Sequence, residues 1–170
     1  MAGSPPPAAC AKVAALMARR YWLMKSEPEA FSIQDLKKAP RGTAFWDGIR
    51  NYQARNFLRD QVQVGDGVLF YHSNANPPAV VGTATVVREA RPDPTQFDAR
   101  DGHYDPDSSE ADPRWFGVDI KFESLFGRTL SLDELRTIPA LADMVLLKRS
   151  RLSVQPVTPD EWRVITKLGA

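Results

Sequence analysis

Short apolar runs separated by turn signals make up most of the chain after residue 20. Five of them are rich in β-branched and aromatic residues and predict strands: Tyr21–Lys25, Val68–His72, Ala79–Arg88, Phe116–Phe126 and Leu152–Val157. In Phe116–Phe126, apolar and polar residues alternate, which is typical of a strand with one buried face. Gly42–Trp46 is a further, brief extended segment, so we expect five or six strands.

Helices are predicted between these strands from their N-terminal signals. A Ser or Thr followed three residues later by an acid forms the capping-box pattern at Ser32/Asp35, Ser131/Glu134 and Thr158/Glu161. Asn51 is a fourth candidate N-cap, ahead of apolar residues at helical spacing. The apolar run Leu141–Leu147 fits either a helix or a strand.

The connection between Val68–His72 and Ala79–Arg88 indicates the type of sheet. Residues 73–78 alone separate the two strands, which is too short for the crossover that parallel neighbours need. We therefore predict an α+β domain with a mainly antiparallel sheet, curled into a small barrel and flanked by short helices. The 14 prolines also favour short elements joined by structured loops over long helices.

The composition is that of a single globular domain of 170 residues, with 43% hydrophobic and 25% charged residues. Mean hydropathy is −0.35, and no apolar run approaches the roughly 18 residues that a membrane-spanning helix needs. One cysteine, Cys10, and two histidines, His72 and His103, are too few for a disulfide framework, a zinc knuckle or a His-rich site. We therefore expect no metal, no cofactor and no membrane partner.

The net charge of +1 hides an uneven distribution along the chain. Residues 1–20 carry +3 and contain no acid, residues 93–112 carry −6, and the rest carries +4. A total this close to zero excludes a protein held on nucleic acid by bulk charge alone. Chance is the simpler explanation of the partition. The pattern nevertheless predicts an acidic, proline-rich loop over Arg91–Pro113, of a length typical of functional or mobile loops.

The first 20 residues are rich in alanine and proline and lack the continuous apolar core of a secretory signal. Three interpretations fit them: a disordered tail, an over-extended start with Met17 as the true first residue, and a short organelle-targeting segment. We expect residues 1–20 to be a disordered or misassigned extension and residues 21–170 to form the domain.

Common catalytic motifs are missing from the sequence. It contains no P-loop, no Gly-x-Gly-x-x-Gly turn after a strand and no Cys-x-x-Cys pair. A hydrolase built from His72 with Ser26, Ser73 or Ser153 has little support, because no nucleophile-elbow pattern surrounds these serines.

Three segments concentrate side chains that suit recognition. Phe45–Arg59 holds adjacent aromatic residues, three amides and three arginines, which suit base faces, base edges and phosphates respectively. Tyr71–Asn74 ends a strand beside a loop, and Lys148–Ser153 places three basic residues in four positions. Each also has a structural interpretation: an amphipathic helix with a core tryptophan, a turn, and a surface charge run.

Eight sequence blocks, in this order, resemble the EVE domain family. They are YWLMKSEP, FSIQDL, WDGIRNYQARNFLR, GDGVLFYHSN, PPAVVGTATVVR, PDPTQFD, PRWFGVDIKF and RLSVQPV, and the resemblance extends over essentially Tyr21 to Leu168. It implies a PUA-like fold, a small β-pseudobarrel with flanking helices, related to the YTH domains that bind N6-methyladenine in an aromatic cage. It also implies a reader of a modified base in DNA or RNA, with modified cytosines as the favoured candidates.

Together with the clusters above, the resemblance implies two sets of contact residues. The base-binding pocket would contain Ser26, Trp46, Asn51, Tyr71, His72, Ser73 and Trp115, with Trp46 as a cage wall and with Ser26 and Asn51 on the base edge. The nucleic-acid backbone would contact Arg50, Arg55, Arg59, Arg149, Arg151 and Ser153. The expected partner is nucleic acid with a modified base, and no catalytic residue is needed. We expect a monomer.

Two other functions stay open at this point. Related ASCH domains include amidohydrolases that use a lysine and a glutamate in the same type of pocket, and Lys25 with Glu27 or Glu123 is the corresponding pair here. The acidic loop Arg91–Pro113 is an alternative site for a protein partner. We expect a cytoplasmic protein if the source is bacterial, and a nuclear or organellar one if it is eukaryotic.

Overall fold

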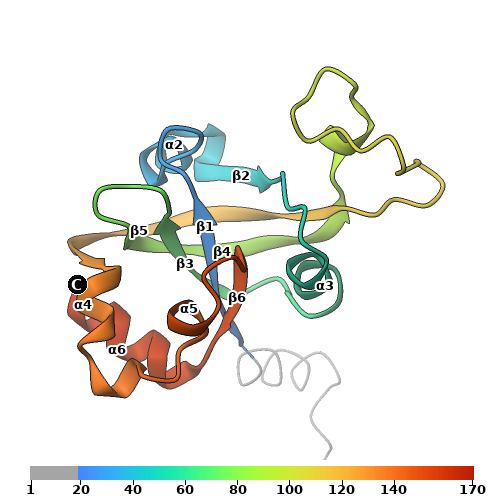
Figure 1. Ribbon diagram of the computed structural model, residues 1–170. Helices are drawn as coiled ribbons and strands as arrows, with labels where there is room; N and C mark the ends of the chain where they lie inside the picture. The colour runs from blue at the N-terminus through green and yellow to red at the C-terminus, as the bar shows by residue number, and fades with distance from the viewer. Residues whose placement is uncertain (1–18) are drawn as a thin grey trace, which may run out of the picture.

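The computed structural model describes residues 19–170, which form one curled sheet with helices around it (Figure 1). The strands are β1 (Tyr21–Ser26), β2 (Thr43–Trp46), β3 (Gly67–His72), β4 (Ala79–Pro92), β5 (Phe116–Ser131) and β6 (Val154–Val157). The helices are α2 (Ile33–Lys38), α3 (Tyr52–Asp60), α4 (Leu132–Arg136), α5 (Val145–Lys148) and α6 (Pro159–Gly169), with 3₁₀ turns at Pro40–Gly42, Pro94–Phe97 and Pro139–Leu141. The interpretations of residues 1–18, including Met17 as the first residue, lie outside the described residues.

The sheet has the strand order β2-β5-β4-β3-β1-β6, and every neighbouring pair except one is antiparallel. The prediction of a mainly antiparallel sheet is therefore confirmed. The exception is the parallel pair β1–β3, in which Tyr21 lies opposite Gly67 and Ser26 opposite His72. Because parallel strands end at the same edge, Ser73, which comes directly after β3, lies beside Ser26 at the end of β1. The Ser73 backbone N–H donates to the Ser26 carbonyl at 3.0 Å.

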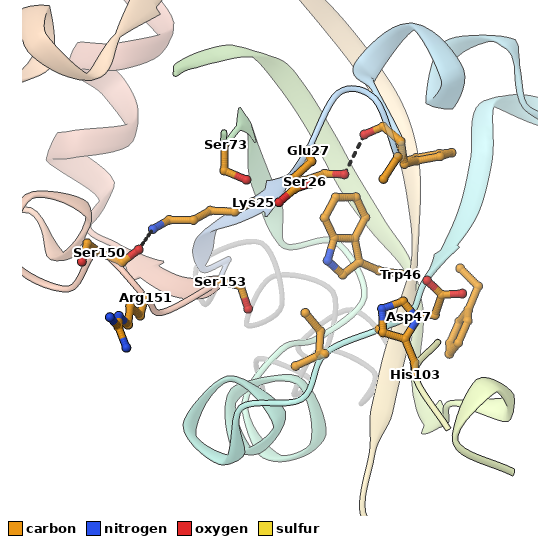
Figure 2. Close-up of a pocket in the computed structure, with 15 residues that line it drawn as sticks. Lys25, Ser26, Glu27, Trp46, Asp47, Ser73, His103, Ser150, Arg151 and Ser153 are labelled. Carbon is orange, nitrogen blue, oxygen red and sulfur yellow. Dashed lines mark hydrogen bonds between the residues drawn. The ribbon is translucent and has the colours of Figure 1, made fainter. Parts of the chain in front are cut away.

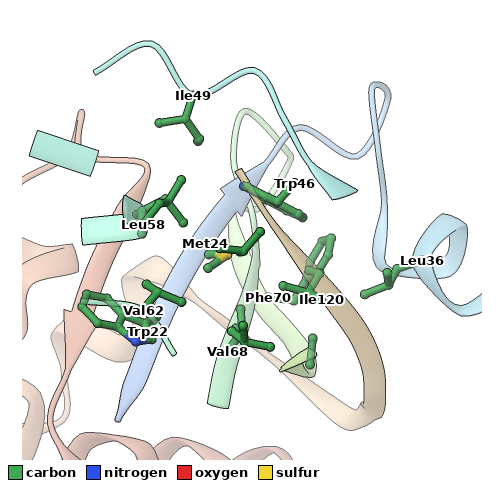
Figure 3. Packing of buried hydrophobic residues seen from close by; sticks show 14 of the residues in the cluster. Trp22, Met24, Leu36, Trp46, Ile49, Leu58, Val62, Val68, Phe70 and Ile120 are labelled. Atoms are coloured by element: carbon green, nitrogen blue, oxygen red, sulfur yellow. The ribbon is translucent and has the colours of Figure 1, made fainter. Parts of the chain in front are cut away.

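The inner face of the sheet surrounds the larger apolar core (Figure 3). Trp46 from the edge strand β2 and Val154 from the opposite edge strand β6 belong to this one cluster, together with Ala54 and Leu58 of α3. Two edge strands can share a core in this way only if the sheet curls. The structure therefore confirms an α+β, PUA-like pseudobarrel with short flanking helices.

The outer face of the same strands packs against the C-terminal helices. Side chains alternate between the faces of a strand, so Leu23 points outward while its neighbours Trp22 and Met24 point into the larger core. Leu135 of α4 and Ile165 of α6 cover this outer face. The helices α4 and α6 leave uncovered the end of the sheet at which β1 and β3 stop (Figure 1).

Two of the three predicted capping boxes are complete, at Ser32/Asp35 and Thr158/Glu161. The third is only half formed. Ser131 Oγ accepts the Glu134 N–H at 3.2 Å, but the Glu134 carboxylate accepts from Arg128 instead of the Ser131 backbone. A competing arginine therefore replaces the reciprocal hydrogen bond that the pattern predicts.

Several strand boundaries differ from the prediction. Strands β4 and β5 extend to Pro92 and Ser131 because they pair with each other along most of their length, with several register shifts. Strand β6 begins only at Val154. The ambiguous run Leu141–Leu147 contains the end of a 3₁₀ turn and the start of α5, not a strand. Within residues 19–170, no helix is long and apolar enough to cross a membrane, and no group of three or more His, Cys, Asp or Glu side chains is placed to hold a metal ion.

Candidate nucleic-acid interface

A pocket of about 850 Å³ opens at the edge where β1, β2 and β3 end (Figure 2). Its walls come from residues 25–27, 30–31 and 45–49, together with Ser73, His103, Ser150, Arg151 and Ser153. Segments far apart in the sequence therefore meet here, because the parallel β1–β3 pair and the antiparallel β1–β6 pair bring them to one edge. The volume lies within the range of about 300–1,000 Å³ that is usual for small-ligand sites.

Lys25 ties the segment before β6 to the end of β1. Its backbone N–H donates to the Ser153 carbonyl at 2.9 Å, and its ammonium donates to the Ser150 carbonyl at 2.8 Å. Burial lowers the pKa of the Lys25 ammonium below its ordinary value. An ammonium has three N–H donors, so two remain for a ligand. On the next residue, Ser26 Oγ donates to the Phe31 carbonyl at 2.6 Å, so its own lone pairs stay available to accept a hydrogen bond.

Trp46 belongs to the pocket and to the core at the same time. Its exposed fraction is 6%, and its ring meets Phe70 and Phe31 edge-on at centroid distances of 5.4 and 6.3 Å. Figure 2 shows the indole beside the pocket, between Ser26 and Asp47. The residue is therefore placed where the prediction put it, while its packing also holds β2 against the core.

The turn after β2 and the acidic loop form the opposite wall. Gly48 has a φ of +77°, and a Cβ added to it would lie 2.9 Å from His103 Nε2, so the imidazole packs directly on the glycine backbone. Asp101 holds His103 through its carboxylate, which lies 3.2 Å from Nδ1 and accepts the His103 N–H at 2.8 Å. The Asp47 side chain lies beside His103 on this wall (Figure 2).

Arg50 and Asp93 hold the acidic loop in this position. Arg50 donates to the His103 carbonyl at 2.7 and 3.0 Å, to Thr95 Oγ1 at 3.0 Å and to the fully buried Asp93 carboxylate at 3.0 Å. Burial would raise the pKa of Asp93, but hydrogen bonds from Thr95, the Gly48 N–H and Arg50 outweigh it and hold the pKa below its ordinary value. The loop is thus fixed to the pocket by charged hydrogen bonds.

The sequence profile of the EVE domain, a known protein family, matches residues 20–168. The chain belongs to the EVE domain family. Among its relatives, mouse thymocyte nuclear protein 1 is 48% identical over 165 residues, which cover 87% of this chain and 73% of the mouse protein. The human protein of the same name is 45% identical over the same length and coverage.

Solved structures of EVE domain relatives superpose closely on this chain. A hypothetical protein from Leishmania major has a TM-score of 0.86 and 44% identity, covering 90% of this chain and 96% of its own. Human THYN1 in complex with 5-methylcytosine-containing DNA has a TM-score of 0.84 and 44% identity, covering 88% and 97%. The YTH domain of Zygosaccharomyces rouxii MRB1, in complex with N6-methyladenosine RNA, has a TM-score of 0.52 at 15% identity over 89% and 85% of the chains, a likeness of fold alone.

Three of the seven predicted pocket residues of this EVE domain, Ser26, Trp46 and Ser73, line the pocket. Asn51 does not. Its side chain caps α3 by accepting the Ala54 N–H at 3.0 Å, and it borders a neighbouring hollow of about 260 Å³ formed with residues 148–152. Tyr71 is also outside the pocket, since it follows the alternation of β3 onto the outer face and is 3% exposed.

His72 and Trp115 have structural contacts in place of the predicted pocket contacts. His72 Nε2 accepts the Ile33 N–H at 3.1 Å, and burial lowers the pKa of the imidazole, which favours this neutral acceptor form. The Trp115 indole donates to the Asp105 carboxylate at 2.7 Å and lies 4.9 Å from the Tyr52 ring. Both side chains therefore position loops around the pocket without lining it.

Of the predicted backbone contacts, Arg151 and Ser153 line the pocket. Arg149 borders the neighbouring hollow and donates to Gln53 at 2.6 Å, and Arg59 pairs with Asp60 at 2.7 Å on the surface. Arg55 donates to the Arg114 carbonyl at 2.7 Å. Arg50 is occupied by the acidic loop, as described above, so its predicted phosphate contact does not fit the structure.

The sequence prediction of the EVE domain site missed Asp47 and His103. Asp47-Gly48 gave only a turn signal, and nothing local marks His103, which lies in the middle of the acidic loop. Lys25 and Glu27 entered the sequence analysis only as a candidate catalytic pair, and both line the pocket. The alternative partner Glu123 borders a different hollow, with Arg19 and Trp162, so the pairing of Lys25 with Glu123 is wrong.

Proposed function

We propose that this EVE domain is a non-catalytic module that binds a modified base, first of all a C5-modified cytosine, extruded from nucleic acid. The observation that carries the proposal is the pocket itself, which is lined by Trp46, Lys25 and Arg151 together. The 44% identical human relative whose structure contains 5-methylcytosine DNA supports the choice of ligand.

The neighbouring hollow supports a path for the strand that carries the base. Ser150 and Arg151 border both cavities, and Lys148 and Arg149 border the hollow. Cationic side chains at this position suit the phosphates that flank an extruded nucleotide. The backbone would therefore run past residues 148–151, on the side away from the acidic loop.

The expected affinity is modest. Stacking on an aromatic side chain contributes about 1–3 kcal/mol per base, and extruding the base from a duplex costs a few kcal/mol. A methyl group adds about 0.8 kcal/mol when buried. We accordingly propose shallow discrimination between modified and unmodified bases, and tighter binding to single strands than to duplexes.

We also propose that the domain acts as a monomer. The proposed location is the nucleus for a eukaryotic source, in keeping with the name of the curated relatives, and the cytoplasm for a bacterial one. Residues 1–20 are proposed to be an extension outside the binding domain.

Isothermal titration calorimetry tests the function with single-stranded oligonucleotides that carry one 5-methylcytosine, 5-hydroxymethylcytosine, N6-methyladenine or unmodified base. Arg151→Gln is the informative variant, and Arg163→Gln on α6, which pairs with Asp160, is its matched control. We expect Arg151→Gln to weaken binding about tenfold and Arg163→Gln to leave it unchanged. Absence of heat with every oligonucleotide would refute the function. Trp46→Ala is a poor test, because a buried tryptophan lost from the core costs about 3–5 kcal/mol of stability.

A second function, an amidohydrolase acting on an acylated nucleoside, is favoured by one observation. Lys25 and Glu27 line the same pocket, and burial lowers the pKa of the lysine, as a general base requires. Turnover of N4-acetylcytidine that disappears in Lys25→Met would replace the binding function with this one. No turnover above the uncatalysed rate leaves the binding function in place.

A further inference from the structure

The Asp47 carboxylate lines the pocket wall formed by the turn after β2, and no other residue holds it. Among residues 19–170, none besides Asp47 itself donates a hydrogen bond to it, whereas Asp93, Asp101 and Asp105 each accept one or more from other residues. Arg50, the nearest arginine in sequence, is occupied by Asp93, Thr95 and His103. The carboxylate therefore lines the pocket with no donor from another residue.

The surroundings make this free carboxylate a strong acceptor. Partial desolvation at the pocket wall, and next the repulsion from Asp93, raise the pKa of Asp47, while His103 and the Asp47 backbone N–H act in the opposite direction. A partly desolvated carboxylate gains most from a hydrogen-bond donor that arrives with a ligand.

The pocket is also polarised from one wall to the other. Figure 2 shows Lys25 and Arg151 on one side and Asp47 with His103 on the other. Lysine and arginine side chains offer donors only, and an ionised carboxylate offers acceptors only. A ligand that contacts both Lys25 and Asp47 therefore needs an acceptor toward Lys25 and a donor toward Asp47.

We propose that Asp47 is a specificity-determining residue that accepts a hydrogen bond from the exocyclic amino group of the bound base. The proposal rests on the function proposed above and narrows its ligand class to bases with an exocyclic amino group, first of all cytosines. The edge of cytosine carries an amino donor beside a ring-nitrogen acceptor, which matches the Asp47 carboxylate and the Lys25 ammonium on opposite sides of the pocket. Thymine and uracil carry a carbonyl where cytosine has its amino group, so their oxygen would face the Asp47 carboxylate.

5-Methylcytosine and thymine provide a matched pair of ligands, because both carry the same methyl group and differ at the amino-bearing edge. The experiment titrates the full chain with one single-stranded oligonucleotide that contains either base at the same position. We expect the wild-type protein to prefer 5-methylcytosine about tenfold or more, in keeping with the usual worth of a specific base contact.

Asp47→Asn is the test variant, and Asp160→Asn on α6, outside the pocket, is its matched control. Both remove one negative charge by an isosteric amide, and neither residue is buried. An asparagine amide can turn its N–H₂ toward a carbonyl, so Asp47→Asn should bring the two affinities to within about threefold of each other. Asp160→Asn should keep the tenfold preference. Circular dichroism checks that each variant is folded, and Asp47→Ser replaces the Asn variant if it is not.

The outcomes separate the two proposals. If the wild-type protein binds neither oligonucleotide, the proposed function itself fails. If it binds both equally, or if Asp47→Asn and Asp47→Ser retain the preference, the base-binding function stands and the role of Asp47 is overturned. Loss of the preference in the folded Asp47 variant, by weaker 5-methylcytosine binding or by stronger thymine binding, supports the role.

Discussion

A single buried carboxylate, that of Asp93, connects the pocket to the acidic loop. It accepts from the Gly48 N–H at 2.8 Å on the pocket side, from Arg50 at 3.0 Å, and from the Thr95 N–H and hydroxyl at 2.8 and 2.6 Å in the loop. Replacing it by an amide leaves one oxygen to serve these donors. At the residue scale, exchanging one Asp93 oxygen for an NH₂ group therefore affects several hydrogen bonds at once.

Asp93→Asn is expected to lower the free energy of unfolding at pH 7 by roughly 2–3 kcal/mol, because charged hydrogen bonds are lost and buried donors are left without acceptors. Urea unfolding measures the change. The control is Asp133→Asn, whose side chain is 94% exposed and pairs only with Arg136 at 3.5 Å. Equal stability of the two variants would contradict the role of Asp93.

The same carboxylate predicts a pH dependence. The folded-state pKa of Asp93 is lowered, so its contribution to stability is complete above the unfolded-state pKa of about 3.9 and is lost as the pH falls through the lower folded-state pKa. Wild-type protein should therefore lose more stability than Asp93→Asn between pH 6 and pH 2, as followed by urea unfolding at several pH values. Parallel curves for the two proteins would exclude this assignment.

The site was only partly predictable at this scale. Ser26, Trp46, Ser73, Arg151 and Ser153 lie at the pocket as the family resemblance implied. Arg50 was misassigned because the partner of a guanidinium depends on how a distant loop folds. The sequence neighbourhood of Arg50 holds amides and arginines, whereas its partners in the acidic loop lie 43 to 53 positions away.

At the scale of elements, the approach of β5 to β2 at Gly117 positions the pocket wall. A Cβ at Gly117 would overlap the Trp46 carbonyl oxygen and come within 2.6 Å of the Phe45 ring. Both residues line the pocket, and a backbone oxygen cannot move without moving the strand. The glycine is thus needed for β2 to pair closely with β5 at this point.

Gly117→Ala should therefore displace the end of β2, cost about 1–3 kcal/mol of stability and weaken base binding. Thermal melting and calorimetry measure the two effects. Gly102→Ala is the control, because a Cβ there meets no atom within 4 Å although the residue precedes His103. If Gly117→Ala behaves like Gly102→Ala, the close approach has no consequence.

The capping boxes give a second test among the elements. Thr158→Ala should destabilise the domain by about 1 kcal/mol, because the hydroxyl accepts the Glu161 N–H at 3.1 Å at the start of α6. Chemical unfolding measures the change. Thr158→Ser, which keeps the hydroxyl, should restore most of the lost stability. A Thr158→Ala variant as stable as the wild type would show that solvent replaces the cap at no cost.

The elements themselves were largely predictable, and the reasons differ among them. Helix starts at Ser32 and Thr158 depend on residues three positions apart, so the local sequence determines them. The parallel pairing of β1 with β3 depends on contacts across more than 40 residues, and no local pattern distinguishes it. The extension of β4 to Pro92 has the same cause, since its partner strand β5 supplies the hydrogen bonds.

For the whole molecule, the charge distribution now has a spatial meaning. The −6 segment forms one wall through His103, and the cations of residues 148–151 lie at the other side of the pocket. A molecule with cations on only one side of its pocket can contact few phosphates. Its near-neutral total charge fits recognition of one base better than a grip on a long stretch of backbone.

Binding to a single-stranded oligonucleotide should therefore depend weakly on salt. Three cations at phosphates predict a slope of about −2 for log K against log salt concentration, from about −0.7 per phosphate. Titrations between 50 and 400 mM salt measure it, and Arg149→Gln should make the slope shallower by less than one unit. A slope steeper than about −4 would indicate an extended backbone contact in place of a local one.

The hydrogen bond from Lys25 to Ser150 joins positions 125 residues apart in the chain. A pocket closed by such a bond forms only when β1 and β6, the first and last strands along the chain, are both in place. Ligand binding at the site is therefore thermodynamically linked to folding of the entire domain. A ligand at 100 times its dissociation constant would add about 2.7 kcal/mol to that global stability. A damaged or partly folded copy would therefore lack the pocket altogether and could not compete with intact copies for the proposed ligand.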